Sequence, residues 1–383
     1  MSEKTLNIMV ATDIHYLSKS INDGGEAFAN MIAKGDGKVM KYIEEIVDTF
    51  CAEVKKRKPD VLLLLGDLTF NGERVSHLEL AKKLKKIVEA GIPVYLIPGN
   101  HDINYENCFG FKGDERYRVE SVDANDFREI YSFCGYKNYD YYDEISGSYI
   151  SKIADDLYLL MLDTNSYSSN YFKEESFIWL ENVLKEISKN NANILAVSHQ
   201  NLLEQNFMFT EGFMIENAER IEEIYEKYNV KLNLSGHMHI QHIKNNIIPE
   251  IVTSSLAVSP NHFASIVYDG ESFVYSTECL NVESIENFAA ISRDEFKIMG
   301  SRQLSKLFKT APYENEDEAD IEKMSKVFLK MNECYFSGEI FDPYGFEEGM
   351  KIWEEQHESF TSLYIKSILD SVFKDQNRFI LKL

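Results

Sequence analysis

Up to about residue 283, short apolar runs alternate with longer segments that have helical spacing. Mainly apolar runs at 5–12, 61–65 and 93–97 predict strands. The run at 61–65 is wholly apolar, which is typical of a strand buried on both faces. Over 39–56 and 75–90, apolar residues recur every three or four positions, which predicts two amphipathic helices. This alternation favours an α/β sheet whose functional side chains lie at the carboxyl ends of its strands.

The alternation continues beyond residue 147. The expected strands are 148–153, 157–163, 193–198, 231–235, 249–257, 263–268 and 272–277. The expected helices are 176–189 and 215–228. Asp269-Gly270 predicts a hairpin turn between the last two strands. Two stretches lack a clear period, so we interpret the glycine-rich segment 22–37 as a polar loop and the aromatic-rich segment 103–147 as a long insertion near the site.

The pattern changes after residue 283. The remainder is helical and amphipathic, and an acidic run at 314–320 is most simply a solvated loop. We therefore expect a catalytic domain at 1–283 and a helical accessory domain at 284–383. The sequence is compatible with three roles for the helical domain: a dimer contact, a cover for the pocket, or support for the first domain.

Charge and composition narrow the partners and the compartment. The 383 residues are 44% hydrophobic and 27% charged, as in a soluble globular protein with a sizeable core. A formal charge of −23 disfavours a broad basic face for a nucleic-acid polymer or an anionic membrane. No window approaches the ~20 apolar residues of a membrane span. The first apolar stretch is too short for a signal-peptide core and is interrupted by Asp13, so we expect a cytoplasmic protein.

Cysteine usage agrees with a reducing compartment. The chain has 5 cysteines, an odd number, and none forms a C-x-x-C pair. We therefore expect free and mostly buried thiols, with neither a disulfide framework nor a thiolate zinc site.

Five short polar segments each follow a predicted strand. They are Asp13-Ile14-His15, Gly66-Asp67, Gly99-Asn100-His101-Asp102, Ser198-His199 and Gly236-His237-Met238-His239. Each segment alone is explained as readily by capping or core hydrogen bonds, but five in series predict a site for two divalent metal ions. Residues two apart on an extended chain point the same way, so a D-x-H or H-x-H pair can reach one ion. Carboxylate, amide and imidazole donors without thiolate suit manganese, iron or zinc.

Glycine precedes the polar residues in three of these segments. We expect Gly66, Gly99 and Gly236 to let the backbone turn tightly beside the site.

The five segments resemble the calcineurin-like metallophosphoesterase family, whose pattern is D-x-H, G-D, G-N-H-[DE], H and G-H-x-H. Every element is present in order. The resemblance implies a mixed α/β fold in which a two-sheet β-sandwich is flanked by helices, with a dinuclear site at one edge. It implies that the first metal is held by Asp13, His15, Asp67 and His239. It implies that the second metal is held by Asp67, Asn100, His199 and His237.

The same resemblance assigns catalytic roles. His101 would not bind metal but would face the scissile ester and protonate or stabilise the leaving oxygen, and Asp102 would orient His101. Two divalent ions would lower the pKa of a bridging water, and the resulting hydroxide would attack phosphorus.

The residues around Asp67 narrow the substrate class. Serine/threonine protein phosphatases of this family carry G-D-x-V-D-R-G. This chain has G-D-L-T-F-N-G-E at 66–73, which more closely resembles bacterial class III cyclic-nucleotide and small-molecule phosphodiesterases. We therefore expect hydrolysis of a small phosphodiester, for instance a 3′,5′-cyclic nucleotide. The runner-up is a phosphomonoesterase acting on nucleotides or sugar phosphates.

A function of another class stays open. The chain could be a non-catalytic metal-binding scaffold whose C-terminal helices dock a protein, although such a scaffold would be expected to lose ligands that are all present here. The same helices could form a homodimer. Related DNA nucleases are disfavoured by the negative charge.

The remaining candidates carry weaker signals. We interpret His77, His242 and the lone His357 as structural or surface residues, with His242 the best placed of them to line the pocket, and leave His262 undecided. Asp163-Thr164-Asn165 ends a strand and is expected to support the site. The aromatic side chains of 103–147 fit a packed lid and a nucleobase-stacking surface equally well.

Overall fold

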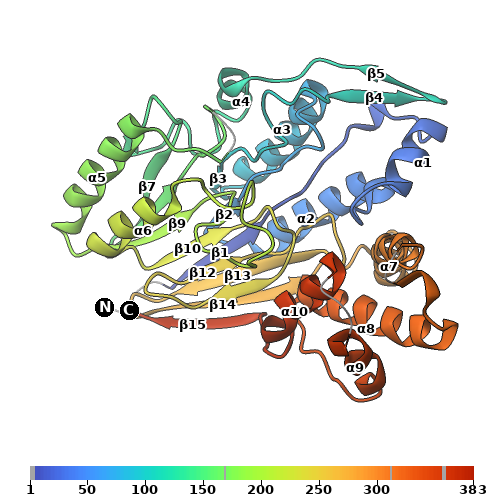
Figure 1. The fold of residues 1–383 in the computed structure, drawn as a ribbon. Coiled ribbons are helices and arrows are strands. Elements are labelled where there is room, and N and C mark those ends of the chain that lie inside the picture. The colour runs from blue at the N-terminus through green and yellow to red at the C-terminus, as the bar shows by residue number, and fades with distance from the viewer. Residues whose placement is uncertain (1–4, 168–169, 311–312, 356–358) are drawn as a thin grey trace.

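Strand β1 (Leu6–Ala11) lies inside the first of two large sheets in the computed structural model, which describes residues 5–167, 170–310, 313–355 and 359–383 (Figure 1). The strand order of this sheet is β15-β14-β13-β1-β2-β3. Its other members are β2 (Val61–Leu64), β3 (Val94–Leu96), β13 (His262–Tyr268), β14 (Ser272–Cys279) and β15 (Arg378–Lys382). β1, β2 and β3 are parallel, so their carboxyl ends meet at one edge.

The second sheet has the order β11-β12-β10-β9-β8-β7-β6. Its strands are β6 (Tyr141–Tyr142), β7 (Tyr149–Ala154), β8 (Leu157–Met161), β9 (Asn193–Val197), β10 (Leu232–Ser235), β11 (His242–Lys244) and β12 (Glu250–Val252). β8 shows how the two sheets form a sandwich. Leu157, Leu159 and Met161 join the core between the sheets, whereas Leu160 packs outward under the helices, as the period of two requires.

Helices cover the outer faces of both sheets (Figure 1). They are α1 (Glu26–Ala33), α2 (Ile43–Arg57), α3 (Arg74–Val88), α4 (Ala124–Ile130), α5 (Glu174–Ser188), α6 (Ala218–Lys227), α7 (Phe288–Leu307), α8 (Glu318–Ser337), α9 (Glu347–Glu355) and α10 (Phe360–Val372). Short 3-10 turns occupy Lys19–Ile21, Met40–Tyr42 and Tyr313–Asn315. α2 ends where Lys58 adopts a left-handed conformation before Pro59, as the sequence predicts. Among the helices of the described residues, none is both long enough and apolar enough to cross a bilayer.

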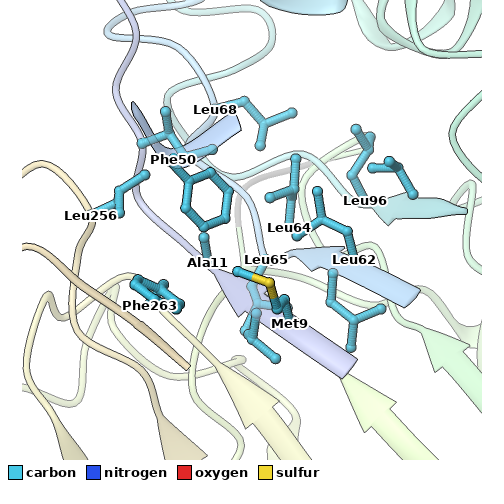
Figure 2. Close-up of a cluster of buried hydrophobic side chains, with 14 of the residues drawn as sticks. Met9, Ala11, Phe50, Leu62, Leu64, Leu65, Leu68, Leu96, Leu256 and Phe263 are labelled. Atoms are coloured by element: carbon cyan, nitrogen blue, oxygen red, sulfur yellow. The ribbon is translucent and has the colours of Figure 1, made fainter. Parts of the chain in front are cut away.

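The side chains around β2 are fully buried and packed between neighbouring strands, close to the sheet edge that carries the site (Figure 2). Leu62, Leu64 and Leu65 have no exposed surface, and they pack among Met9 of β1 and Leu96 of β3. A strand buried on both faces must be apolar throughout, and 61–65 meets that condition. The predicted two-sheet sandwich flanked by helices is therefore confirmed.

The expectation of a loop is wrong for 22–37 and partly wrong for 314–320. Segment 103–147 lies near the site, as expected of the insertion, but it has secondary structure of its own. The segment 22–37 contains α1, and 103–147 contains α4, β6 and a hairpin of β4 (Phe109–Lys112) and β5 (Glu115–Arg118). The last residues of the acidic run begin α8, where carboxylates favour the positive end of a helix. Short β11 and the terminal β15 carried no periodic signal that stood out from their surroundings.

The C-terminal region is helical, as expected, but it returns to the first sheet. β15 pairs antiparallel with β14 as the edge strand. The division at residue 283 and a homodimer through these helices stay predictions. All five cysteines are free, as expected, and only Cys279 is exposed.

Candidate metal centre

The predicted ligands converge where strands of the two sheets end, and the backbone there is unusual. Asp13 and His15 follow β1, Asp67 follows β2, and His237 and His239 follow β10. All five have positive φ, between 49° and 69°. Non-glycine residues in this region cost about 1–2 kcal/mol each, and such strain clusters at functional sites. The left-handed backbone at these five positions therefore directs the five side chains to one point.

Three glycines allow these segments to approach one another. Gly66 has a φ of 94°, and a Cβ there would lie 2.6 Å from His199 Nδ1. Gly99 and Gly236 have no positive φ, but a Cβ would lie 2.1 Å from Asp67 Oδ1 at Gly99 and 2.0 Å from Thr12 Oγ1 at Gly236. Only Gly66 therefore fits the predicted tight turn through backbone conformation, whereas Gly99 and Gly236 are required by close packing.

The first cluster contains Asp13, His15, Asp67 and His239. The Nε2 atoms of His15 and His239 lie 3.1 Å apart. His239 Nε2 lies 3.3 Å from Asp13 Oδ1, and His15 Nε2 lies 3.7 Å from Asp67 Oδ2. These four side chains are the ones predicted for the first metal.

The second cluster contains Asp67, His199 and His237. His199 Nε2 lies 3.3 Å from Asp67 Oδ1 and 3.2 Å from Asn100 Oδ1, so the predicted amide ligand is adjacent. Asp67 directs one carboxylate oxygen to each cluster, which is the placement expected of a bridging ligand.

Neighbouring carbonyl groups fix the imidazoles. His199 Nδ1 lies 2.8 Å from Leu65 O, which leaves Nε2 to face the cluster. His237 Nε2 lies 3.0 Å from Gly212 O, which leaves Nδ1 for a metal. Hydrogen bonds of this kind select the tautomer and orientation of metal-binding histidines.

The protonation states suit cation binding. Burial opposes ionisation of Asp67, but the imidazoles of His199 and His101 hold the pKa of its carboxyl well below its usual range. Burial lowers the pKa of His15 well below its usual value and that of His237 to about 4, so both are neutral ligands near pH 7. The carboxylate charge and the neutral imidazoles of His15 and His237 are what a divalent ion requires. His199 differs, because the carboxylate of Asp67 outweighs burial and raises the pKa of its imidazole to about 9, so a metal ion that binds there displaces a proton.

One buried oxygen atom that accepts no hydrogen bond tests whether a metal ion fits the first cluster. Asp13 Oδ2 accepts hydrogen bonds from Thr12 Oγ1 at 2.7 Å and from the His237 amide at 3.0 Å. Asp13 Oδ1 is buried and accepts none. A buried carboxylate oxygen without a donor is costly, and a cation in the first cluster removes that cost. The donor set therefore fits two divalent ions of the kind that take mixed oxygen and nitrogen ligands.

His101 lies beside the clusters without joining either. Its ring is perpendicular to that of His15, with centroids 5.2 Å apart, and stacks on Tyr105 at 4.9 Å. His101 Nδ1 lies 3.0 Å from both Phe70 O and Asn71 Oδ1. Its Nε2 is thus left to handle a proton.

Asp102 contributes by a different route from the one expected. Its carboxylate accepts hydrogen bonds from Leu68 N, Thr69 N, Thr69 Oγ1 and Gly99 N. It therefore does not orient His101 directly but holds the backbone that leads to Phe70 and Asn71. Burial, and then the charge of Asp67, raise the pKa of Asp102 to about 7.

Comparison with known protein families identifies the family to which this chain and its metal-binding residues belong. The sequence profile of the calcineurin-like phosphoesterase family matches residues 6–241, more than half of the chain. The chain belongs to the calcineurin-like phosphoesterase family. Membership implies a metal-dependent phosphoester hydrolase, and two divalent metals agree with the two clusters. No curated protein matches the sequence.

Among similar solved structures, the first described below supports the fold by its TM-score. A dimetal phosphatase from Danio rerio superposes with a TM-score of 0.52 at 11% identity, covering 72% of this chain and 96% of that one. Purple acid phosphatase PPD1 from yellow lupin gives 0.47 at 11% identity, covering 72% and 52%. GAP50, the anchor in the inner membrane complex of Plasmodium, gives 0.40 at 14% identity, covering 77% and 95%. At 11% identity the likeness to the Danio rerio phosphatase shows the fold alone, and the other two carry no argument.

Two residues of this phosphoesterase site escaped the sequence analysis. Lys38 is buried, and its Nζ lies 2.7 Å from Asp36 Oδ2. It lines, together with His101, a polar cavity of about 920 Å³. Asn71, which contacts His101, was quoted only as part of a motif. Lys38 directly follows Gly37 in the glycine-rich segment and carried no comparable signal.

The structure gives different positions to the histidines and the asparagine for which the sequence signal was weaker. His77 and His262 are buried and hydrogen-bonded to core groups, Tyr131 and Ser254 respectively. His242 lines a cavity near α10 that contains no metal-cluster residue. His357 lies outside the described residues. Asn165 supports the site as expected, because its Nδ2 donates to Pro98 O and to Gln200 Oε1.

Of the two roles weighed for the aromatic segment 103–147, nucleobase stacking stays a prediction. Tyr105, Phe109 and Phe111 line the polar cavity. Tyr136 is buried in the main core. The segment is therefore partly a cavity wall and partly ordinary packing.

Proposed function

We propose that this phosphoesterase hydrolyses a small phosphodiester. The observation that carries the proposal is that space extends from the metal clusters in two directions. The polar cavity of about 920 Å³ contains His101, and a second cavity of about 680 Å³ contains His237 and His239. A phosphorus atom held between them has room for a substituent on each side, whereas a monoester needs only one.

The chain's own residues would hold the metal ions, handle a proton and attract the phosphate group. Two bound divalent ions would activate a water and neutralise phosphoryl charge. Asp13, Asp67, Asn100 and the four histidines of the clusters would hold them. His101, with Nδ1 fixed by Phe70 and Asn71, has Nε2 free to relay a proton to the departing oxygen. Lys38 places a positive charge beside the same polar cavity, where it attracts a phosphate oxygen.

The test compares bis-p-nitrophenyl phosphate with p-nitrophenyl phosphate, using metal-stripped protein reconstituted with manganese. We expect the diester to have the larger kcat/KM. Asp67→Asn, prepared identically, controls for contaminating phosphatase because it removes the oxygen shared between the clusters. A larger kcat/KM for the monoester would overturn the proposal in favour of a phosphomonoesterase on nucleotides or sugar phosphates.

Two further results would refine the class. Hydrolysis of 3′,5′-cyclic AMP would support the cyclic-nucleotide prediction. Two tightly bound metals without hydrolysis of either nitrophenyl ester would favour the scaffold alternative. Which of manganese, iron and zinc is native stays a prediction, measured by metal analysis of protein purified without added metal.

A further inference from the structure

The second cavity lies where the sandwich meets the C-terminal helices. In Figure 1, α7 to α10 gather on one side of the sheets, beyond the ends of the strands that carry the site. The cavity walls come from the loop containing Phe209 and Phe213, from 237–240 after β10, and from α7, α8 and α10. The accessory region therefore contributes directly to a cavity next to the metal clusters.

The wall of this cavity is mainly apolar. Its aromatic side chains are Phe209, Phe213, Phe328, Tyr335, Phe336, Phe360 and Tyr364, and its aliphatic ones include Met238, Ile240 and Leu307. Several rings already pack together, with centroids 5.4 Å apart for Phe209 and Phe213 and 6.0 Å apart for Phe209 and Tyr364. Burying an apolar ligand group here gains free energy in proportion to its area.

Polar groups inside the cavity have partners in the protein. Tyr364 Oη donates to Asn332 Oδ1 at 2.5 Å, and Asn206 Nδ2 donates to Tyr335 Oη at 3.4 Å. Gln303, Lys306 and Thr310, which are exposed, form a polar rim along and just beyond α7. The interior therefore favours a hydrocarbon chain over a nucleobase, whose polar edge would need hydrogen-bond partners.

The cavity is continuous with the reaction centre. His237 and His239 form part of its wall, and the ring of Phe213 lies 5.3 Å from that of His237. Asp36, Met299 and Gln303 line both this cavity and the polar one. A group attached to the phosphorus atom can therefore enter either cavity.

We propose that the substrate is an amphiphilic phosphodiester, an inference that rests on the proposed function. One ester substituent, an aliphatic chain, lies in the cavity formed with the C-terminal helices, and the other, polar substituent lies beside His101. Hydrolysis forms a bond between phosphorus and a water oxygen and breaks the bond to the polar substituent's oxygen. One proton of the attacking water passes by way of His101 Nε2 to the departing oxygen, and the other stays on the phosphate. The products are a monoalkyl phosphate and an alcohol.

The experiment uses methyl, butyl and octyl p-nitrophenyl phosphates with the full-length manganese-loaded protein. The nitrophenol leaves on the His101 side, so only the chain in the apolar cavity changes. We expect kcat/KM to rise about two- to fourfold per added methylene until the cavity is filled. The same kcat/KM for all three esters, or a higher kcat/KM for 3′,5′-cyclic AMP than for the octyl ester, would overturn the inference.

Two matched pairs of variants locate the effect. Lys306→Trp fills the cavity from its exposed rim, and Ser305→Trp adds the same ring to an exposed position outside it. Phe360→Ala removes a 66% exposed wall residue, and Phe373→Ala removes a 44% exposed one that is not part of the cavity. We expect the preference for the octyl ester to fall at least fivefold in Lys306→Trp and Phe360→Ala and to persist in their controls. Equal preferences within each pair would overturn the placement.

A binding measurement separates this inference from the proposed function. Octylphosphonate and methylphosphonate are titrated calorimetrically into the same protein. Tighter binding of octylphosphonate, abolished by Lys306→Trp, would support the apolar cavity even if no diester is hydrolysed. Hydrolysis of diesters together with equal binding of both phosphonates would leave the proposed function standing and overturn the cavity assignment.

Discussion

The Nε2 atoms of His15 and His239 face each other at 3.1 Å, although they lie 224 positions apart in the sequence. Two imidazole nitrogens at this distance need a proton or a cation between or beside them, because two facing lone pairs would repel. The unpartnered Asp13 Oδ1, 3.3 Å from His239 Nε2, favours a cation. The sandwich thus folds into a geometry that a metal ion completes.

The metal-binding prediction follows from that geometry. Manganese at 100 times its dissociation constant should add about 2.7 kcal/mol to the free energy of unfolding. Asp13→Asn should retain the second metal alone, whereas Asp67→Asn should lose tight binding of both because Asp67 faces both clusters. Metal content after gel filtration and thermal unfolding with and without manganese measure these effects. Loss of both metals in Asp13→Asn would contradict the division into two clusters.

His101 should affect turnover without affecting metal content. His101→Gln removes the proton donor while His15 and Asp67 remain, so kcat should fall about 10²-fold or more. The deficit should be larger for phenyl than for nitrophenyl leaving groups, because a weakly basic leaving group needs less protonation. Steady-state kinetics and metal analysis of the same preparation test both statements.

A second variant distinguishes proton donation from general damage. Asn71→Ala removes one of the two groups that fix His101 Nδ1. It should reproduce the leaving-group dependence of His101→Gln to a smaller degree, with little change in KM. A deficit that is the same for every leaving group would argue against the proton-donor role.

The buried carboxyl of Glu73 should make stability depend on pH. Glu73 is fully buried, its carboxylate oxygens accept no hydrogen bond, and burial raises its pKa from 4.5 to about 7. Below pH 4.5 both the folded and the unfolded protein hold this proton, so Glu73 costs nothing. Between pH 4.5 and 7 the unfolded protein releases the proton first, and wild-type stability falls as pH rises.

Glu73→Gln removes this dependence. Its free energy of unfolding, relative to wild type, should rise by about 3 kcal/mol between pH 4.5 and pH 8. Urea unfolding of metal-free protein across this range measures the difference. Glu115→Gln, at an exposed position of β5, controls for the loss of one negative charge. A difference that does not vary with pH would show that Glu73 is not the source.

We expect the buried side chain of Glu250 to contribute strongly to the stability of the fold. Its buried carboxylate accepts hydrogen bonds from Leu202 N, Leu203 N, Gln205 Nε2, Asn233 Nδ2 and Ser235 Oγ. These donors lie just after His199 and just before His237, so Glu250 joins two ligand-bearing segments.

Removing this carboxylate leaves several buried donors unpaired. Glu250→Ala should lower the free energy of unfolding by about 3–5 kcal/mol and weaken the second metal more than the first. Glu223→Ala, at an exposed position of α6, should change stability by less than about 0.5 kcal/mol. Urea unfolding and metal content measure both, and a loss below about 1 kcal/mol in Glu250→Ala would contradict this role.

The sequence predicts the metal ligands well because their signal is local. Each ligand segment follows directly after an apolar strand such as Val61–Leu64, and parallel strands carry such segments to one edge. Glu250 could not be found this way. The five groups that donate hydrogen bonds to it belong to segments 202–205 and 233–235, which only the folded sheet brings to its carboxylate. Lys38 lies at the site only because its loop packs against the sandwich.

The missed elements have similar causes. α1 is short and lies between glycine-rich turns, and it packs on the β4–β5 hairpin that was itself missed. β15 alternates between exposed and half-buried residues, and only the free edge of β14 makes it a strand. In each case long-range packing determined the local conformation.

β15 has one more consequence for how the apolar cavity admits its ligand. β14 and β15 are hydrogen-bonded neighbours, yet α7 to α10 lie between them along the chain. The four helices are thus an insertion within a strand pair, anchored at both ends to one sheet edge. Their two ends therefore stay together on the sheet while the cavity wall is built between them. A ligand enters at the exposed rim formed by Gln303, Lys306 and Thr310.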